Sequence, residues 1–124
     1  MLDGHAEAVL CLVTLLNGDL ASSGDATIRI CDSMTGLTHQ TLKGHQDCVL
    51  DLLVVPKSGE LVSCSRDATI ILWDTRTGRA LRKLTGHTER VNGLALMQSG
   101  ELASASDDGS IRIWTIGQQR ESLF

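Results

Sequence analysis

Residues 44–55 read GHQDCVLDLLVV, and this stretch has two counterparts, GHAEAVLCLVTL at residues 4–15 and GHTERVNGLALM at residues 86–97. The Gly-His pairs therefore recur at intervals of 40 and 42 residues. Self-similarity at a period of this size indicates a repeat architecture. We therefore expect the 124 residues to form a single repeat region, 1–124, with units at approximately residues 3–42, 43–84 and 85–124.

Each unit contains short apolar runs that are separated by turn residues. In the second unit these runs are Val49–Val55, Leu61–Ser65 and Thr69–Asp74, with Gly59 and Asp67 in the turns between them. Short runs bounded by Gly, Asp, Asn and Ser predict strands and not helices. The sequence therefore predicts an all-β fold, with four short antiparallel strands in each of three units.

The composition argues against several classes of function. The formal net charge is −4 and the two signs of charge are interspersed, which disfavours a basic surface for nucleic acid. No apolar run reaches the 18 residues that indicate a membrane-spanning helix, and the N-terminal residues lack the basic and apolar regions of a secretory signal. We expect no nucleic-acid partner, no membrane partner and a cytoplasmic location, with the nucleus as the alternative.

The four cysteines lie in or beside apolar runs, at Cys11, Cys31, Cys48 and Cys64. They show neither Cys-x-x-Cys spacing nor a Cys/His cluster of the zinc type. A free cysteine in such surroundings behaves as a small hydrophobic residue. We therefore expect no metal, no cofactor and no disulfide framework, which agrees with a reducing compartment.

The combination of Gly-His, a gap of fixed length and Trp-Asp resembles the WD-repeat β-propeller family along nearly the whole chain. Trp73-Asp74 matches the motif fully, Trp114 keeps the tryptophan, and Cys31 replaces it in the first unit. The resemblance implies that each unit forms a four-stranded blade and that the blades stack radially around a channel. It also implies a protein–protein interaction scaffold without enzymatic activity, which presents a rim to protein or peptide partners.

The resemblance further implies a buried hydrogen-bonded tetrad of His, Ser, Asp and Trp in each blade, in which every buried polar group is paired. The matching positions are His5, Ser23, Asp25 and Cys31 in the first unit, His45, Ser65, Asp67 and Trp73 in the second, and His87, Ser106, Asp108 and Trp114 in the third. A His/Ser/Asp set would also suit nucleophilic catalysis. Because this set recurs at the same phase in every unit, we interpret it as structural and predict no catalytic residues.

The first unit departs from the pattern twice. Cys31 removes the indole donor, and the interval from Gly18 to Asp25 is one residue shorter than the interval from Gly59 to Asp67. A one-residue deletion within a strand would reverse the faces of its side chains. We expect the adjoining turn to absorb the deletion, and we expect the first blade to be the weakest.

Contact surfaces in the family cluster around the channel opening. The favoured positions lie three and five residues after each Gly-His histidine and one residue before the tetrad Asp. Here they hold Ala8, Leu10, Gly24, Cys48, Leu50, Arg66, Arg90, Asn92 and Asp107. Arg66 and Arg90 suit recognition of carboxylates or phosphates, because a guanidinium forms paired hydrogen bonds. The alternative is that both are ordinary solvated surface residues.

Three blades are too few for a closed ring, since propellers usually have four to eight blades. Either the chain is part of a longer propeller, or copies associate as a homo-oligomer to complete the ring, because an uncovered blade leaves apolar surface in water. A structural or assembly fragment without independent activity is therefore the alternative to the scaffold. An enzyme hosted on a propeller is less favoured, because no unrepeated set of acid, base and nucleophile is present; His39, outside the repeat phase, is interpreted as an exposed strand residue.

Overall fold

The computed structural model describes residues 8–116 of the chain, and these residues form strands and turns without a helix. The strands are β1 (Cys11–Thr14), β2 (Leu20–Ser23), β3 (Thr27–Cys31), β4 (Thr38–Lys43), β5 (Val49–Val54), β6 (Leu61–Ser65), β7 (Ile70–Asp74), β8 (Arg79–Leu84), β9 (Val91–Leu96), β10 (Leu102–Ser106) and β11 (Ile111–Trp114). No helix long and apolar enough to cross a membrane occurs in this part of the chain.

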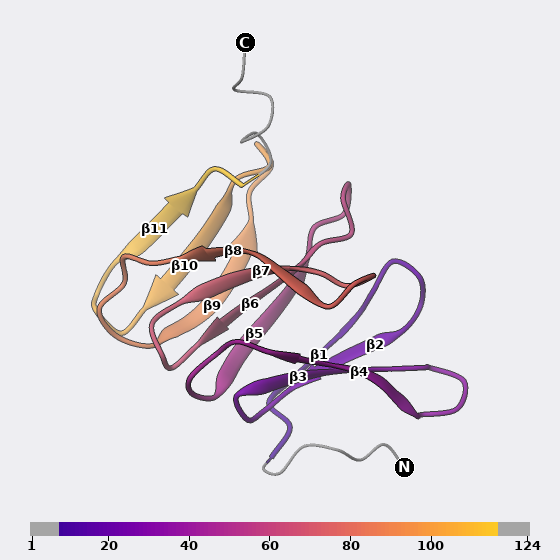
Figure 1. The fold of residues 1–124 in the computed structure, drawn as a ribbon. Helices are drawn as coiled ribbons and strands as arrows, with labels where there is room; N and C mark the ends of the chain where they lie inside the picture. The colour runs from indigo at the N-terminus through magenta and orange to yellow at the C-terminus, as the bar shows by residue number, and fades with distance from the viewer. Residues whose placement is uncertain (1–7, 117–124) are drawn as a thin grey trace.

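The strands form three antiparallel sheets that follow one another in chain order (Figure 1). The first sheet has the order β1-β2-β3-β4, the second β5-β6-β7-β8, and the third β9-β10-β11. We call these sheets blades 1, 2 and 3. The first strands of the blades lie beside one another, since β1 contacts β5 and β5 contacts β9. The all-β prediction is confirmed, with blades of four, four and three described strands.

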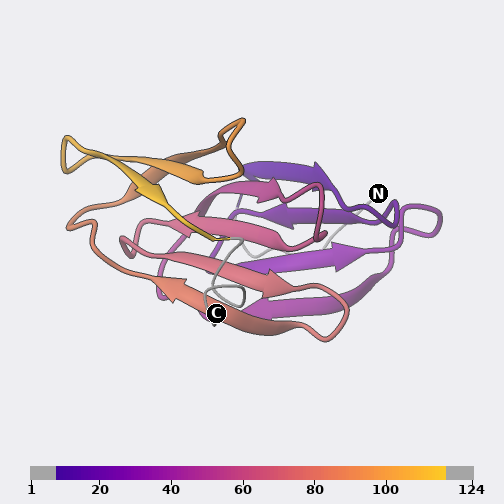
Figure 2. The same ribbon diagram turned by 90° about the horizontal axis from the view of Figure 1, so that it is seen from above.

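A fourth strand in blade 3 is expected near Leu123, which lies outside the described residues. The boundaries of the three repeat units stay a prediction; the described strands of each sheet fall within one unit except for Lys43, the last residue of β4. Figure 2, a view from above, shows the three sheets stacked against one another. This is the arrangement in which each blade covers the apolar face of its neighbour.

Two apolar cores hold the blades together. Blade 2 contributes to both, because successive side chains of a strand face opposite sides of its sheet. Ile28 and Ile30 of blade 1 pack with Leu52, Leu61 and Trp73 of blade 2. On its other face, blade 2 packs against blade 3, and that core contains Val62, Cys64, Ile70, Leu72, Leu84, Val91, Leu102 and Ile116. Full burial of each Leu or Ile contributes about 1.5–3 kcal/mol, so the interfaces between blades are a main source of stability.

The missing residue of the first unit lies in the β2–β3 turn. Ser23 pairs with Ile28 across that turn, whereas Cys64 pairs with Ile70 across the longer β6–β7 turn. At the end of the strands away from the turn the register is the same in both blades, since Leu20 pairs with Cys31 in the way that Leu61 pairs with Trp73. The prediction that the turn absorbs the deletion is confirmed.

Candidate functional site

Blade 2 contains a chain of buried hydrogen bonds that joins two strands, the loop before β5 and the β6–β7 turn. The indole Nε1 of Trp73 on β7 donates to Ser63 Oγ on β6 at 2.8 Å. The same hydroxyl lies 2.7 Å from Nε2 of His45, which precedes β5. On the other side of the imidazole, Nδ1 lies 3.1 Å from Oδ2 of Asp67 in the β6–β7 turn. Both the imidazole and the indole are almost completely buried.

One proton arrangement satisfies every group in this chain. The Ser63 hydroxyl accepts a hydrogen bond from the indole N–H and donates its own O–H to Nε2 of His45. Nδ1–H of the neutral imidazole then donates to Asp67. The environment agrees with this assignment, because burial lowers the pKa of His45 below 6.5 despite the opposing effect of the Asp67 charge. A neutral histidine therefore connects the tryptophan to the ionised aspartate.

Asp67 also fixes its own turn. Its Oδ1 accepts hydrogen bonds from the N–H and the hydroxyl of Thr69, and its Oδ2 accepts one from the N–H of Gln46. Burial alone would raise the pKa of Asp67, but these hydrogen bonds outweigh it and the pKa is lowered. The carboxylate thus ties the loop before β5 to the β6–β7 turn.

Blade 3 repeats this arrangement. Trp114 Nε1 donates to Ser104 Oγ at 2.9 Å, His87 Nε2 lies 2.8 Å from the same hydroxyl, and His87 Nδ1 lies 2.9 Å from Asp108 Oδ2. Ser110 takes the place of Thr69 and donates to Asp108. The hydrogen bonds from Ser110, and then that from His87, hold the pKa of Asp108 far below its usual range.

The serine of these networks is not the one that the sequence analysis named. Ser65 donates to the carbonyl of Asp47 and accepts from the N–H of Asp67, so it fixes the turn and does not bridge the two rings. Ser106 does the same in blade 3, with Glu89 and Asp108. The physical reason is the strand period, because Ser63 and Ser65 lie two residues apart and share a face of β6. The imidazole of His45 and the indole of Trp73 reach Ser63, the earlier of the two serines.

Blade 1 has a different set of residues at these positions. The prediction of Ser23 as the network serine is also wrong, because Ser23 takes the register position of Cys64, and its buried Oγ has no hydrogen-bond partner within residues 8–116. Ser22 takes the position of Ser63 instead. Cys31 occupies the tryptophan position, as expected, and burial raises the pKa of its thiol. The remaining predicted member, His5, lies outside the described residues.

The turn of blade 1 keeps part of the pattern. Asp25 Oδ1 accepts hydrogen bonds from the N–H and hydroxyl of Thr27, as Asp67 does from Thr69. The carbonyl of Asp25 also accepts a hydrogen bond from the N–H of Val49 at 2.9 Å, which links this turn to blade 2.

A family profile described as "WD domain, G-beta repeat" matches residues 1–32, 36–74 and 78–115. The chain belongs to the WD-repeat family. Its three matched segments account for most of the chain. Each segment contains the first three strands of one blade, and the second and third segments begin with β4 and β8, the fourth strands of the preceding blades. A comparison with curated proteins gives no match. WD repeats indicate a protein-interaction scaffold, and proteins built from them are generally not enzymes.

The predicted rim positions of this WD-repeat chain lie at one end of the blades, at the start of each first strand and in the turn between the second and third strands. In blade 2, the N–H of Arg66 donates to the carbonyl of Cys48 at 2.9 Å. In blade 3, the N–H of Asp107 donates to the carbonyl of Arg90 at 3.1 Å. The backbone therefore brings the rim residues of blades 2 and 3 together.

The two rim arginines differ in their surroundings. Arg90 Nε lies 3.3 Å from Asp107 Oδ2, and Asn92 donates to the other oxygen of that carboxylate. Arg66 is exposed, and its guanidinium forms no ion pair with residues 8–116. Ala8 and Leu10 are exposed, Leu50 and Cys48 are partly exposed, and Gly24 is buried. Arg66 is therefore the free cation of the described rim.

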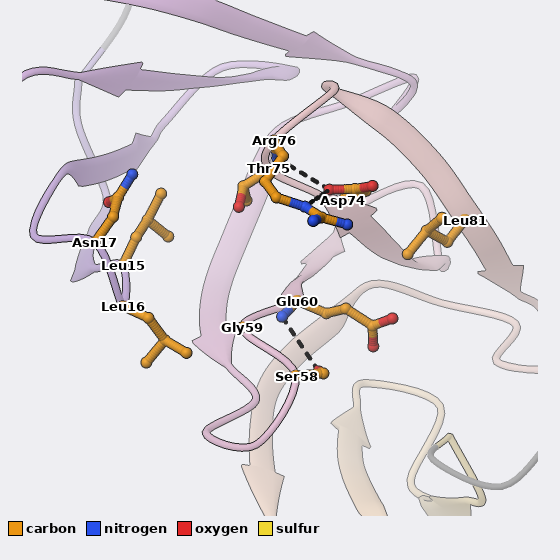
Figure 3. A pocket seen from close by; sticks show the side chains of 10 residues that line it. All are labelled: Leu15, Leu16, Asn17, Ser58, Gly59, Glu60, Asp74, Thr75, Arg76 and Leu81. Carbon is orange, nitrogen blue, oxygen red and sulfur yellow. Dashed lines mark hydrogen bonds and ion pairs between the residues drawn. The ribbon is translucent and has the colours of Figure 1, made fainter.

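The opposite end of the blades has a groove at each junction. Figure 3 shows the first groove, about 300 Å³, between Leu16 and Asn17 of blade 1 and turns of blade 2 that carry Glu60 and Arg76. The second, about 650 Å³, lies between the β5–β6 turn and blade 3. Arg76 Nε is 3.5 Å from Asp74 Oδ1, so the charges of the first groove are partly paired within it. Within residues 8–116, no cluster of His, Cys, Asp or Glu could hold a metal ion.

Proposed function

We propose that this WD-repeat chain is a protein-interaction scaffold whose partner binds the rim. The support comes from Arg66, which projects from a turn that a backbone hydrogen bond fixes to Cys48 at the start of β5. A guanidinium on a rigid turn loses little conformational freedom on binding. Its paired donors suit a carboxylate or phosphate group on a protein or peptide partner.

The other rim residues of blade 2 would add apolar contact. Cys48 directly precedes β5 and Leu50 lies near its start, at the same end of the blade as Arg66, and both are partly exposed. In blade 3, the Arg90–Asp107 ion pair carries little net charge but presents hydrogen-bonding groups. The proposed partner therefore has an acidic or phosphorylated group for blade 2 and uncharged polar groups for blade 3.

A binding module fits these residues better than an enzyme does. Ser63, His45 and Asp67 have the order of a nucleophilic triad, but the serine is completely buried and its oxygen accepts the indole proton of Trp73. A nucleophile must reach a substrate and an oxyanion site. We therefore assign these residues to structure, and we retain the cytoplasm as the proposed location, with the nucleus as the alternative.

The experiment compares two charge reversals, Arg66→Glu on the rim and Arg76→Glu at the opposite end. Both side chains are exposed, so neither variant should lose more than a small part of its stability. We expect Arg66→Glu to abolish capture of acidic and phosphorylated peptides from an immobilised library, and Arg76→Glu to retain it. Equal capture by the two variants, with unchanged unfolding curves, would reject the rim as the binding surface.

A further inference from the structure

Blade 3 exposes residues whose counterparts are buried in blade 2. Ile111 and Ile113 on β11 are 72 % and 50 % exposed. By strand register they correspond to Ile70 and Leu72 on β7, which are 0 % and 1 % exposed because blade 3 packs against them. We call the blade 3 surface with Ala103, Ala105, Ile111 and Ile113 the forward face.

Blade 1 exposes the opposite half of the same kind of interface. Val9 and Leu12 are 55 % and 54 % exposed. They hold the repeat positions of Val49 and Leu52, which are 0 % and 5 % exposed because blade 1 packs against them. We call the blade 1 surface around Val9 and Leu12 the rear face.

We propose that the forward face of one chain packs against the rear face of a second copy of this chain. The contact continues an interface that the molecule already contains twice, since blade 1 packs on blade 2, and blade 2 on blade 3, in this forward-to-rear sense. Ile111 and Ile113 then take the roles of Ile28 and Ile30 in the first core. This inference goes beyond the rim function, because it concerns the flat faces of the blades and not their ends.

A second copy is favoured as the partner because it carries both halves of the interface. Each internal interface joins the third-strand pair of one blade to the first-strand Val and Leu of the next. The forward face keeps the Ile pair, and the rear face keeps Val and Leu. Neither internal interface joins two like faces, so the contact between copies is heterologous and lets further copies add until the rotation between blades closes a ring.

The experiment uses the full chain with one face altered at a time, and the mass is measured by light scattering. A forward-face variant, Ile111→Asp with Ile113→Asp, places two charges where a neighbouring blade would cover them. A rear-face variant, Leu12→Asp, does the same on blade 1. We expect wild-type assemblies larger than one 13.3 kDa chain and complete loss of association in each variant alone.

Mixing the two variants provides the decisive measurement. The forward-face variant keeps its rear face and the rear-face variant keeps its forward face, so one intact interface can form between them. We expect the mixture to give a one-to-one complex and nothing larger. Association of either variant with itself would show a like-to-like contact and would overturn the proposal.

Met34→Asp is the matched control, because Met34 is 91 % exposed in the β3–β4 turn and belongs to neither face. It should keep the wild-type mass. The fluorescence of Trp73 and Trp114 reports whether each variant remains folded. A folded wild-type chain that stays a single copy up to its solubility limit would overturn the proposal, as would aggregation that neither face variant reduces.

Discussion

The carboxylate of Asp51, on β5 of the middle blade, accepts a hydrogen bond from the backbone N–H of Leu94 on β9, 3.0 Å away. Its other oxygen accepts a hydrogen bond from Cys11 Sγ on β1, at 3.3 Å. One side chain therefore links the first strands of all three blades. Because β9 is an edge strand, alternate N–H groups along it lack a partner in their own sheet, and Asp51 satisfies one of them.

Asp51→Ala should lower the free energy of unfolding by about 1.5–3 kcal/mol, since a hydrogen bond to a charged acceptor is lost and the N–H of Leu94 is left unpaired. Asp51→Asn keeps one acceptor oxygen and should cost less. Urea unfolding followed by tryptophan fluorescence measures both. Asp107→Ala, at an exposed carboxylate, is the control. An equal loss in Asp51→Ala and Asp107→Ala would show that Asp51 does not couple the blades.

Ser63→Ala should destabilise the protein more than Ser65→Ala. Removal of the Ser63 hydroxyl leaves Nε1 of Trp73 and Nε2 of His45 buried without a partner, at an expected cost of about 2–4 kcal/mol. Ser65→Ala removes hydrogen bonds only to backbone groups, the carbonyl of Asp47 before β5 and the N–H of Asp67 in the turn. Denaturant unfolding of both variants, with Ser58→Ala as an exposed control, measures the difference. The opposite order of stability would restore Ser65 as the bridging residue.

These two serines show how far the sequence determines the networks. The repeat period identified the units and the strands, and the resemblance to the WD-repeat family pointed to His45, Asp67 and Trp73. It could not choose between Ser63 and Ser65, because both lie on the same face of β6. The choice depends on how far the indole and the imidazole reach across the sheet, and this follows from the pairing of Trp73 with Leu61.

Contacts between blades were less accessible to sequence reasoning. Asp51 and Leu94 are 43 residues apart, and no repeated motif marks them as a pair. Within blade 3, Arg90 and Asp107 were both predicted as rim positions, but the ion pair between them depends on the loop and turn meeting at one end of the blade. Such contacts are set by packing between elements and not by local patterns.

Blade 1 should open more readily than blade 3. It lacks the indole donor at Cys31, and the buried Oγ of Ser23 has no partner within residues 8–116. We expect amide protons on β2 to exchange with solvent faster than those on β10, the equivalent strand of blade 3, because local opening costs less where buried polar groups are unpaired. Native-state hydrogen exchange, resolved by peptide, measures this. Equal protection of the two strands would show that the missing indole does not weaken blade 1.

Acidification should destabilise blade 2 through His45 before it does so through Asp67. Burial lowers the pKa of His45 below 6.5, so as the pH falls below 6.5 the unfolded chain takes up a proton that the folded chain resists. The free energy of unfolding should therefore decline below pH 6.5. The pKa of Asp67 is lowered below 3.8, so its stabilising contribution is fully present above pH 3.8 and is lost as the pH falls through its folded pKa.

His45→Gln should flatten the decline in the free energy of unfolding between pH 6.5 and pH 5, measured by urea unfolding at each pH. The control Leu52→Ala is destabilised but keeps every histidine, so it should show the same decline as the wild type. The wild-type slope in His45→Gln would exclude His45 as its source.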